Sequence, residues 1–486
     1  MRNARSVGNR NTGFVGNRNT RSVGNRNAEI VATDTPKRPP AYPLGDAIPP
    51  AVLKRQAEGL ARARQRGLIG GLPTYVRLGG PGFIGAALTL GAGTMTSSML
   101  AGAEFGYRTL WIFWVAAGSG MFMMAAMARF TCQGGFNLIE KQAELHGWFL
   151  ARVLTAAVGM VTVAVAFNFG QVALGTHLID SLAQIDGPGF AQEVNWPLYI
   201  LLTSWIALSY GRGSSGGTKL LEAFMKWSLA AMILCFAACL AIVGIDWPAA
   251  LRGTFVPWLP SGVAGIDLFI ASTAAAIGVA DWVLYHFTAH VKGWKREHEG
   301  LARVDLIAGF FVPFFVVNFL IVSVFAGTLY ASGDVPRSAA ELARALVPLL
   351  GETGASYAFM IGFLAVPVTS TIGLCLLSAM GIHEVMGWKP DVRSWRWKVC
   401  LLLPQIGFLA AWYPSPVMLI IIIAAALSLT NNIVGWSFYM MLNDRKLMGA
   451  ARPKSRIWNL GIMIQITLLN CVAITYVFNR LGWWQS

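Results

Sequence analysis

The sequence predicts an all-α, polytopic membrane protein with about eleven transmembrane helices. Its composition is the first reason, because 55% of the 486 residues are hydrophobic and 13% are charged, whereas a soluble domain is about 25% charged. The second is the length of its apolar stretches. A transmembrane helix needs about 20 apolar residues to cross a hydrocarbon core of roughly 30 Å, and such stretches recur from Gly80 to the C-terminus.

The region before the first span, residues 1–77, is predicted to be a basic, disordered tail that ends in a linker. Between Arg5 and Ala28 the octapeptides RSVGNRNT, GFVGNRNT and RSVGNRNA follow one another. They are polar and lack the apolar periodicity that stacked helical repeats need. A Pro-rich stretch from Pro36 to Pro50 follows. The tail either contacts anionic lipid or precedes the true start of the protein, and residues 78–486 form the transmembrane domain.

Apolar periodicity places eleven spans in that domain. In chain order they cover about 80–105, 108–130, 150–178, 196–211, 219–245, 264–290, 304–330, 355–381, 397–412, 415–441 and 458–479.

The formal net charge of +15 is a topology signal and does not indicate nucleic acid as a partner. With the basic tail inside, the even-numbered connections face the cytoplasm, and the connection from Asp180 to Asn195 on the other side has no Lys or Arg. This alternation follows the positive-inside rule. The expected location is the inner (cytoplasmic) membrane of a bacterium. The basic residues of the even-numbered connections are Lys141, Arg212, Lys219, Lys292, Lys295, Arg296, Lys389, Arg393, Arg396, Lys398, Arg445, Lys446, Arg452, Lys454 and Arg456.

Eleven helices fit a LeuT-type 5+5 inverted repeat with one additional helix. In that arrangement each half begins with a helix broken near the bilayer midplane, so helices 1 and 6 hold the site. Gly91 and Gly93 lie in the middle of the first span and permit an unwound stretch. Asp281 lies in the sixth span, although neither Gly nor Pro follows it directly.

Four segments of the chain resemble the NRAMP transporter family. GPGFIGAALTLGAGTMTSSMLAGAEFGYRTLW (Gly80 to Trp111) resembles the family's first two helices, and GFNLIEKQAELHG (Gly135 to Gly147) its second intracellular connection. GFLAVPVTSTIG (Gly362 to Gly373) resembles the eighth helix and NDRKLMG (Asn443 to Gly449) the end of the tenth. The resemblance implies an eleven- or twelve-helix inverted-repeat fold and proton-coupled uptake of manganese, iron or related divalent ions.

The sequence departs from the family's pattern at the metal-binding positions. The family's Asp-Pro-Gly-Asn falls on Gly91, Ala92, Gly93 and Thr94, so that its carboxylate and amide are both missing. Its Met-Pro-His stretch falls on Ala280, Asp281 and Trp282, which removes a thioether and introduces a carboxylate. Two carboxylates of the family's proton route fall on Asn168 and Gln171, which form hydrogen bonds but do not titrate.

The loss of the thioether favours a hard ion. Oxygen ligands from carboxylate, hydroxyl, carbonyl and water suit magnesium, calcium or manganese, and magnesium keeps several of its waters. We expect Asp281 and Thr94 to bind the ion together with the carbonyl groups near Gly91, and Ala280 and Thr430 to line the same site. This resembles the NRAMP-related magnesium transporters, which also lack the methionine. Asp281 could equally well cap the second half of a broken helix 6.

Further polar residues within the spans are candidates for a pathway or gate. Glu104 lies near the end of the first span and is either a gate or a solvated residue at the outer mouth. His286 and His290 share a helix face and could meet a metal or relay a proton, although His290 adjoins the interface. Other candidates serve either the pathway or interhelical packing. These are Asn168, Gln171, Asn431 and Asn432, of which the last two replace a family Leu-Pro in helix 10.

The chain carries no phosphate-binding glycine loop and no nucleophile–base constellation, so the sequence predicts neither an enzyme nor a cofactor. The leading hypothesis is a secondary transporter of divalent metal cations that works by alternating access, with the metal ion and the lipid bilayer as its partners. Movement down the electrochemical gradient needs no titrating group, because 100 mV contributes about 2.3 kcal/mol per charge. The alternatives are an NRAMP-like scaffold that transports another small solute, and a membrane sensor that does not transport.

Overall fold

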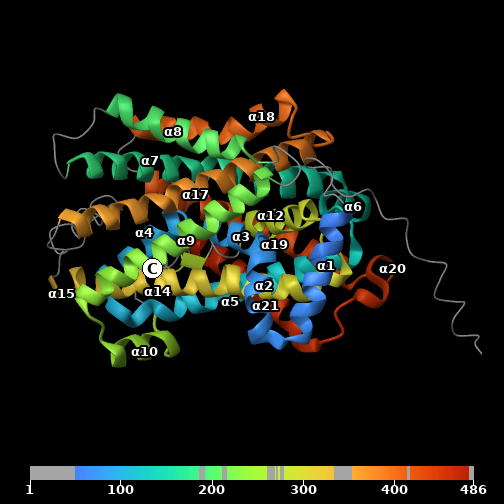
Figure 1. The fold of residues 1–486 in the computed structure, drawn as a ribbon, viewed down its shortest axis with the longest axis horizontal. Coiled ribbons are helices and arrows are strands. Elements are labelled where there is room, and N and C mark those ends of the chain that lie inside the picture. Colours follow the sequence, from blue (N-terminus) through green and yellow to red (C-terminus); the bar gives the residue numbers. More distant parts are fainter. Residues whose placement is uncertain are drawn as a thin grey trace, which may run out of the picture. The chain divides into compact units, whose positions relative to one another are not determined.

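The protein is a bundle of long helices, as the sequence predicts. The computed structural model describes residues 50–184, 192–210, 216–259, 269, 272–273, 278–332, 353–412 and 416–480, and all regular structure in them is helical. Residues 40–486 form one compact unit, in which the long helices run beside one another (Figure 1). Residues 1–49, with the octapeptide repeats, lie outside the described residues.

Each predicted span coincides with helical structure. Span 6 is described mainly in its second half, because most residues from 260 to 277 lie outside the described part of the chain. In chain order the spans are α3 with α4 (Pro81–Thr89, Ala92–Phe105), α5 (Leu110–Arg129), η3 with α7 (Phe149–Thr162, Val163–Gln184), α8 (Gln192–Leu208), α9 (Gly216–Val243), α12 (Val279–Val291), α13 with η5 and α14 (Glu299–Leu306, Ile307–Phe311, Val312–Gly327), α17 (Thr353–Met386), α18 with η7 (Trp395–Leu402, Leu403–Trp412), α19 (Pro416–Asn443) and α21 (Arg456–Arg480).

The predicted linker before the first span differs from the structure. Residues 50–78 form two helices, α1 (Pro50–Gln65) and α2 (Gly67–Leu78), which pack against each other. Leu60, Ala63 and Tyr75 are buried on their apolar faces and belong to the main hydrophobic core. The expectation of a disordered tail up to residue 77 is therefore wrong for this part, because α1 is amphipathic and finds a partner that composition alone does not reveal.

The helices differ in how deeply they lie in the bundle. In the described part of the chain, five segments are long and apolar enough to cross a membrane, and Val194–Leu208 is a shorter apolar helix. Within Met360–Met386, which belongs to α17, 83% of the most apolar stretch is buried, whereas the figure for Lys219–Val243 of α9 is 28%. Helix α17 is therefore central, and α9 lies at the periphery with one face uncovered.

Short elements gather at two ends of the bundle. At one end, which we call the basic end, lie α1, α2, α6 (Leu138–His146), η4 (Arg296–His298) and α20 (Arg445–Met448). Near the other lie η1 (Gly106–Thr109), α10 (Trp247–Phe255) and α15 (Leu329–Ser332), and Figure 1 shows α1, α6 and α20 apart from α10 and α15. The basic end carries several of the charged connections that the sequence predicts to lie on one side of the membrane.

Candidate functional site

The first membrane-spanning helix is broken at the predicted glycine. Helix α3 ends at Thr89, and α4 begins at Ala92 after an extended Gly91 with φ −90° and ψ −175°. Any residue can adopt this backbone conformation, so the glycine is required here because a side chain has no room. A Cβ atom on Gly91 would lie 2.5 Å from Gln171 Nε2 and 3.1 Å from Ser370 Oγ. Glycine therefore lets helices α7 and α17 approach the break closely.

Gln171 caps the second half of this broken helix. Its Oε1 atom accepts a hydrogen bond from the Ala92 N–H at 3.0 Å. Ala92 is the first residue of α4, and its N–H has no partner within the helix. Gln171 is buried, with 4% of its surface exposed. The Gln171 amide, which stands where the family has a carboxylate, thus provides the hydrogen-bond partner for the first N–H of α4.

Hydroxyl groups satisfy the carbonyl groups on the α3 side of the break. The buried Thr94 donates its hydroxyl to Thr89 O at 2.6 Å, so this side chain bridges the two half-helices. Ser370 of α17 donates to Ala87 O at 2.7 Å. The hydroxyl oxygens of Thr94 and Ser370 keep lone pairs with which they can accept or coordinate.

The break expected in the sixth span is described only at the start of α12, which we call the second break; residues 274–277 before it lie outside the described part of the chain. Gly278 is extended, with φ −64° and ψ 154°, and the helix begins at Val279. The Val279 N–H donates to Asn431 Oδ1 of α19 at 3.3 Å. A side-chain amide therefore meets the first N–H of the second half-helix at both breaks, from Gln171 in one case and from Asn431 in the other.

Asp281 stands in the first turn after the second break and is 4% exposed. Gly278 occupies the N-cap position, so Asp281 does not take the N-cap place that the sequence allowed for it. Three residues into the helix, its carboxylate still lies where the helix dipole favours a negative charge. Ala280, its neighbour, is also buried.

Within the described residues, no group of three or more His, Cys, Asp and Glu side chains is placed to hold a metal ion. An ion bound at Asp281 would therefore need its other ligands from hydroxyl, amide and carbonyl oxygens and water. Such a ligand set suits hard cations, and in particular those that keep part of their hydration shell.

Asn168 belongs to an interhelical hydrogen-bond network. Its Nδ2 atom donates to Pro404 O at 2.7 Å, and its Oδ1 atom accepts from the Thr371 hydroxyl at 2.8 Å. The Tyr199 hydroxyl lies 2.7 Å from the same Thr371 oxygen. The network joins α7, α8, α17 and η7, which supports the packing interpretation of Asn168. Ser370 and Thr371 were not predicted as site residues, although polar side chains in the middle of a long apolar span could have indicated them.

The two histidines of α12 hold a connection at the basic end. His286 is fully buried, with Nδ1 2.7 Å from the Thr131 hydroxyl, and Nε2 accepts from the Leu138 N–H at 3.1 Å. His290 Nε2 lies 3.0 Å from Phe136 O. Both nitrogens of His286 are thus engaged with the connection between α5 and α6, and neither faces the two breaks.

The remaining candidates lie at separate places. Glu104 is half-buried in the last turn of α4. The next residue, Phe105, lines a cavity of about 980 Å³ near η1 and α10. In α19, Thr430 is half-buried and Asn432 is buried, beside the Asn431 that caps α12. The structure thus brings Gly91, Thr94 and Gln171 together at one break, and at the other it places Asn431 against Val279, two residues before Asp281.

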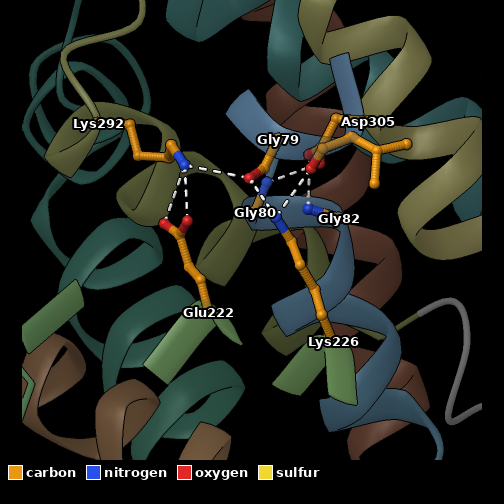
Figure 2. A network of polar contacts seen from close by, with 8 residues as sticks. Gly79, Gly80, Gly82, Glu222, Lys226, Lys292 and Asp305 are labelled. Atoms are coloured by element: carbon orange, nitrogen blue, oxygen red, sulfur yellow. Dashed lines mark hydrogen bonds and ion pairs between the residues drawn. The ribbon is translucent and has the colours of Figure 1, made fainter. Parts of the chain in front are cut away.

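A buried carboxylate caps the beginning of α3 at the basic end. Asp305 of α13 is 2% exposed and accepts hydrogen bonds from Gly80 N–H at 2.8 Å and Gly82 N–H at 2.6 Å. Figure 2 shows Asp305 beside Gly80 and Gly82 at the start of α3. A Cβ atom on Gly80 would lie 2.5 Å from the carboxyl carbon of Glu222, so this glycine too marks a close approach.

Two lysines complete this arrangement, which we call the α3 network. Lys226 Nζ donates to Val76 O at 2.8 Å and to Gly79 O at 3.0 Å. Lys292 Nζ donates to Gly79 O at 3.2 Å and forms an ion pair with Glu222 at 2.9 Å (Figure 2). Together with Asp305, these side chains tie the start of α3 to α9, α12 and α13. No sequence motif predicted this network.

Comparisons with known proteins agree with this fold. The family model described as natural resistance-associated macrophage protein-like matches residues 82–477. The divalent metal cation transporter MntH of Acidiphilium cryptum is 24% identical over 415 residues, which cover 82% of this chain and 90% of that protein. MntH of Caldanaerobacter subterraneus is 24% identical over 427 residues, covering 85% of this chain and 96% of the relative.

Solved structures show the same architecture. The manganese transporter of Eremococcus coleocola superposes with a TM-score of 0.67 at 14% identity, covering 85% of this chain and 88% of that one. MhsT in complex with L-phenylalanine gives 0.55 at 15% identity, with 82% and 98% covered. These likenesses show a LeuT-type transporter fold. With the match over residues 82–477, they establish that the chain is an integral membrane protein of the NRAMP family.

Proposed function

We propose that the protein is a secondary transporter that moves a divalent metal cation across the membrane by alternating access. The observation that carries this proposal is the buried Asp281 carboxylate in the first turn after the break before α12. An ionisable side chain within a membrane span is costly and marks an ion or substrate pathway by default. The names of the curated relatives, which are divalent metal cation transporters, agree with this assignment.

The ion is a hard one, such as Mg²⁺ or Mn²⁺. Thr94 and the carbonyl groups at the end of α3 supply oxygen atoms at the first break, and Asp281 supplies a carboxylate at the second. Ala280 stands where the family has a thioether, so a soft ligand is missing from this position. Oxygen ligands and retained water select for hard cations.

Alternating access is supported by the way α3 is held at the basic end, which we assign to the cytoplasmic side together with the N-terminus. The α3 network ties the start of this half-helix to three other helices through hydrogen bonds and one ion pair. Release of these contacts would free α3 to move relative to α9 and α13. A half-helix hinged at Gly91 and held by polar contacts at its far end is a suitable gate.

Transport in this proposal is not coupled to protons. Asn168 and Gln171 stand on the third helix, where the family carries titratable groups, and amides do not titrate. Both are also engaged in hydrogen bonds that hold helices together. The membrane potential alone supplies about 2.3 kcal/mol per charge at 100 mV, which is sufficient to drive uptake of a divalent cation.

The deciding experiment measures calorimetric binding and proteoliposome flux of Mg²⁺, Mn²⁺ and Ca²⁺ by the wild type and by Asp281→Asn. The substitution keeps the shape of the side chain and removes its charge, so saturable flux should fall by about tenfold or more. Asp391→Asn, which alters an exposed carboxylate at the basic end, is the matched control and should transport normally. Absence of binding and flux for all three ions in the wild type would refute the metal proposal.

A second candidate, the transport of another small solute on the same scaffold, is favoured by one observation. The described residues offer no cluster of three or more titratable metal ligands, while amide and hydroxyl groups surround both breaks. Binding of an uncharged or zwitterionic solute in the absence of divalent cations would support this alternative.

A further inference from the structure

A cavity of about 800 Å³ lies between the helices α1 and α2 and the start of α9. It is separate from the two breaks, and the transport proposal places no ligand in it. Its polar lining includes Arg55 of α1, Arg77 of α2 and Lys219 of α9, together with the Lys226 and Lys292 of the α3 network. The cavity is therefore surrounded by cations from α1, α2 and α9 and from the end of α12.

The positive charge of this cavity is not neutralised by the protein. Glu222 is the acidic residue in its lining, and both carboxylate oxygens already lie 2.9 Å from Lys292 Nζ (Figure 2). Arg55, Arg77 and Lys219 are exposed and have no hydrogen-bond or ion-pair partner among the described residues. Three charges in one place, without partners, create a field that attracts an anion.

A neighbouring cavity of about 350 Å³ extends this field. Arg62 and Arg66 line it together with Arg77, which also lines the larger cavity. No acidic residue lines the smaller cavity. Helices α1 and α2 therefore present a continuous cationic surface beside α9.

The other walls of the larger cavity are apolar and lead to the uncovered face of α9. Phe83 and Trp227 line the cavity. Along α9, Leu220, Trp227 and Leu234 are exposed by 60%, 76% and 70%. They follow one another at intervals of seven residues and so lie on one face of the helix. In a membrane span that is only 28% buried, this face meets the lipid acyl chains.

We propose that this cavity binds an anionic phospholipid, with the phosphate between Arg55, Arg77 and Lys219 and an acyl chain along Trp227 and the exposed face of α9. Cations at the membrane surface attract anionic headgroups, and the apolar stripe that begins in the cavity fits a lipid better than a soluble anion. The lipid would join α1 and α2 to α9. It would thus act beside the α3 network, without contacting the ion site.

The proposal is tested with the full chain purified in detergent, by titration with phosphatidylglycerol and phosphatidylcholine in native mass spectrometry. The wild type should bind phosphatidylglycerol more tightly. The variant Arg55→Gln/Arg77→Gln/Lys219→Gln should bind it between about tenfold and a hundredfold more weakly, since each surface cation increases the affinity for an anionic headgroup by a similar factor. A matched control, Lys389→Gln/Lys398→Gln/Lys446→Gln, removes three exposed charges elsewhere and should bind as the wild type does.

Two further measurements separate a lipid from a soluble anion. Trp227→Ala should weaken phosphatidylglycerol binding and leave the binding of glycerol phosphate unchanged. Glycerol phosphate and inorganic phosphate should compete only at concentrations far above those of the lipid. Equal lipid affinity in the two triple variants would overturn the proposal, as would competition by either soluble anion at lipid-like concentrations. Because the readout is lipid binding, the result is independent of whether the protein transports a metal.

Discussion

Gln171 Oε1 accepts a hydrogen bond from the Ala92 N–H at 3.0 Å, and its Nε2 atom occupies the space that a Cβ atom on Gly91 would need. One side chain of α7 thus satisfies the start of α4 and requires glycine immediately before it. The relationship explains why the first helix is broken here without the proline of the family motif.

Gly91→Ala should push the amide of Gln171 away from Ala92. We expect a loss of stability of about 1–2 kcal/mol, the usual effect of removing a helix cap, and a lower rate of transport. Gln171→Ala removes the same hydrogen bond, so the double variant should be little worse than Gln171→Ala alone. Thermal unfolding in detergent and flux assays measure both effects. Gly300→Ala is the control, because nothing lies within 4 Å of its added Cβ atom; full additivity of the two substitutions would contradict the coupling.

Asp305→Asn should loosen the start of α3. The amide keeps the size of the carboxylate but has only one acceptor atom, so one of the two hydrogen bonds from Gly80 and Gly82 is lost. We expect faster hydrogen exchange in the peptide covering these residues and a loss of stability of about 1–3 kcal/mol. Unchanged exchange there, compared with Asp391→Asn, would show that the α3 network does not hold this helix.

His286 should prove to be a structural residue. His286→Ala leaves the Leu138 N–H and the Thr131 hydroxyl without this partner in a buried place, which lowers stability by about 1–3 kcal/mol. The dissociation constant for the transported ion should stay within about twofold of the wild type, because both ring nitrogens are used elsewhere. Isothermal titration calorimetry checks this. A tenfold weaker ion affinity would instead place His286 in the pathway.

Uptake should follow the membrane potential and ignore the proton gradient. In proteoliposomes with an inside-negative potassium diffusion potential, flux should continue when a pH gradient is absent and the internal pH should stay constant. A pH-sensitive dye inside the vesicles provides the measurement. Proton entry that scales with metal entry would show that a group other than Asn168 or Gln171 carries protons.

The sequence predicted the fold because membrane helices are governed by local composition and length. All eleven expected spans are helical where the structure describes them, and the break at Gly91 lies where the glycines indicated. The linker up to residue 77 was predicted wrongly in its second part, since residues 50–78 form α1 and α2. Their stability comes from Leu60, Ala63 and Tyr75 packing into a core built by distant segments.

The ion-binding roles of the candidate residues stay predictions. Asp281 and Thr94 could be named from a resemblance and from the high cost of polar groups in a membrane. The hydrogen-bond partners at these breaks could not be predicted, because Gln171 is 79 residues from Ala92 in the sequence and Asn431 is 152 residues from Val279. For the same reason the sequence could not distinguish a pathway role from a packing role for Asn168, whose partners lie on η7 and α17.

By itself, the sequence determined that the protein is a helical membrane protein of this family, because hydrophobic length, charge alternation and short motifs are local properties of the chain. Only the tertiary structure decided which polar groups satisfy the broken helices and how Asp305 holds the start of α3. These are contacts between residues far apart in the chain. Their formation depends on the packing of whole helices, which no local pattern encodes.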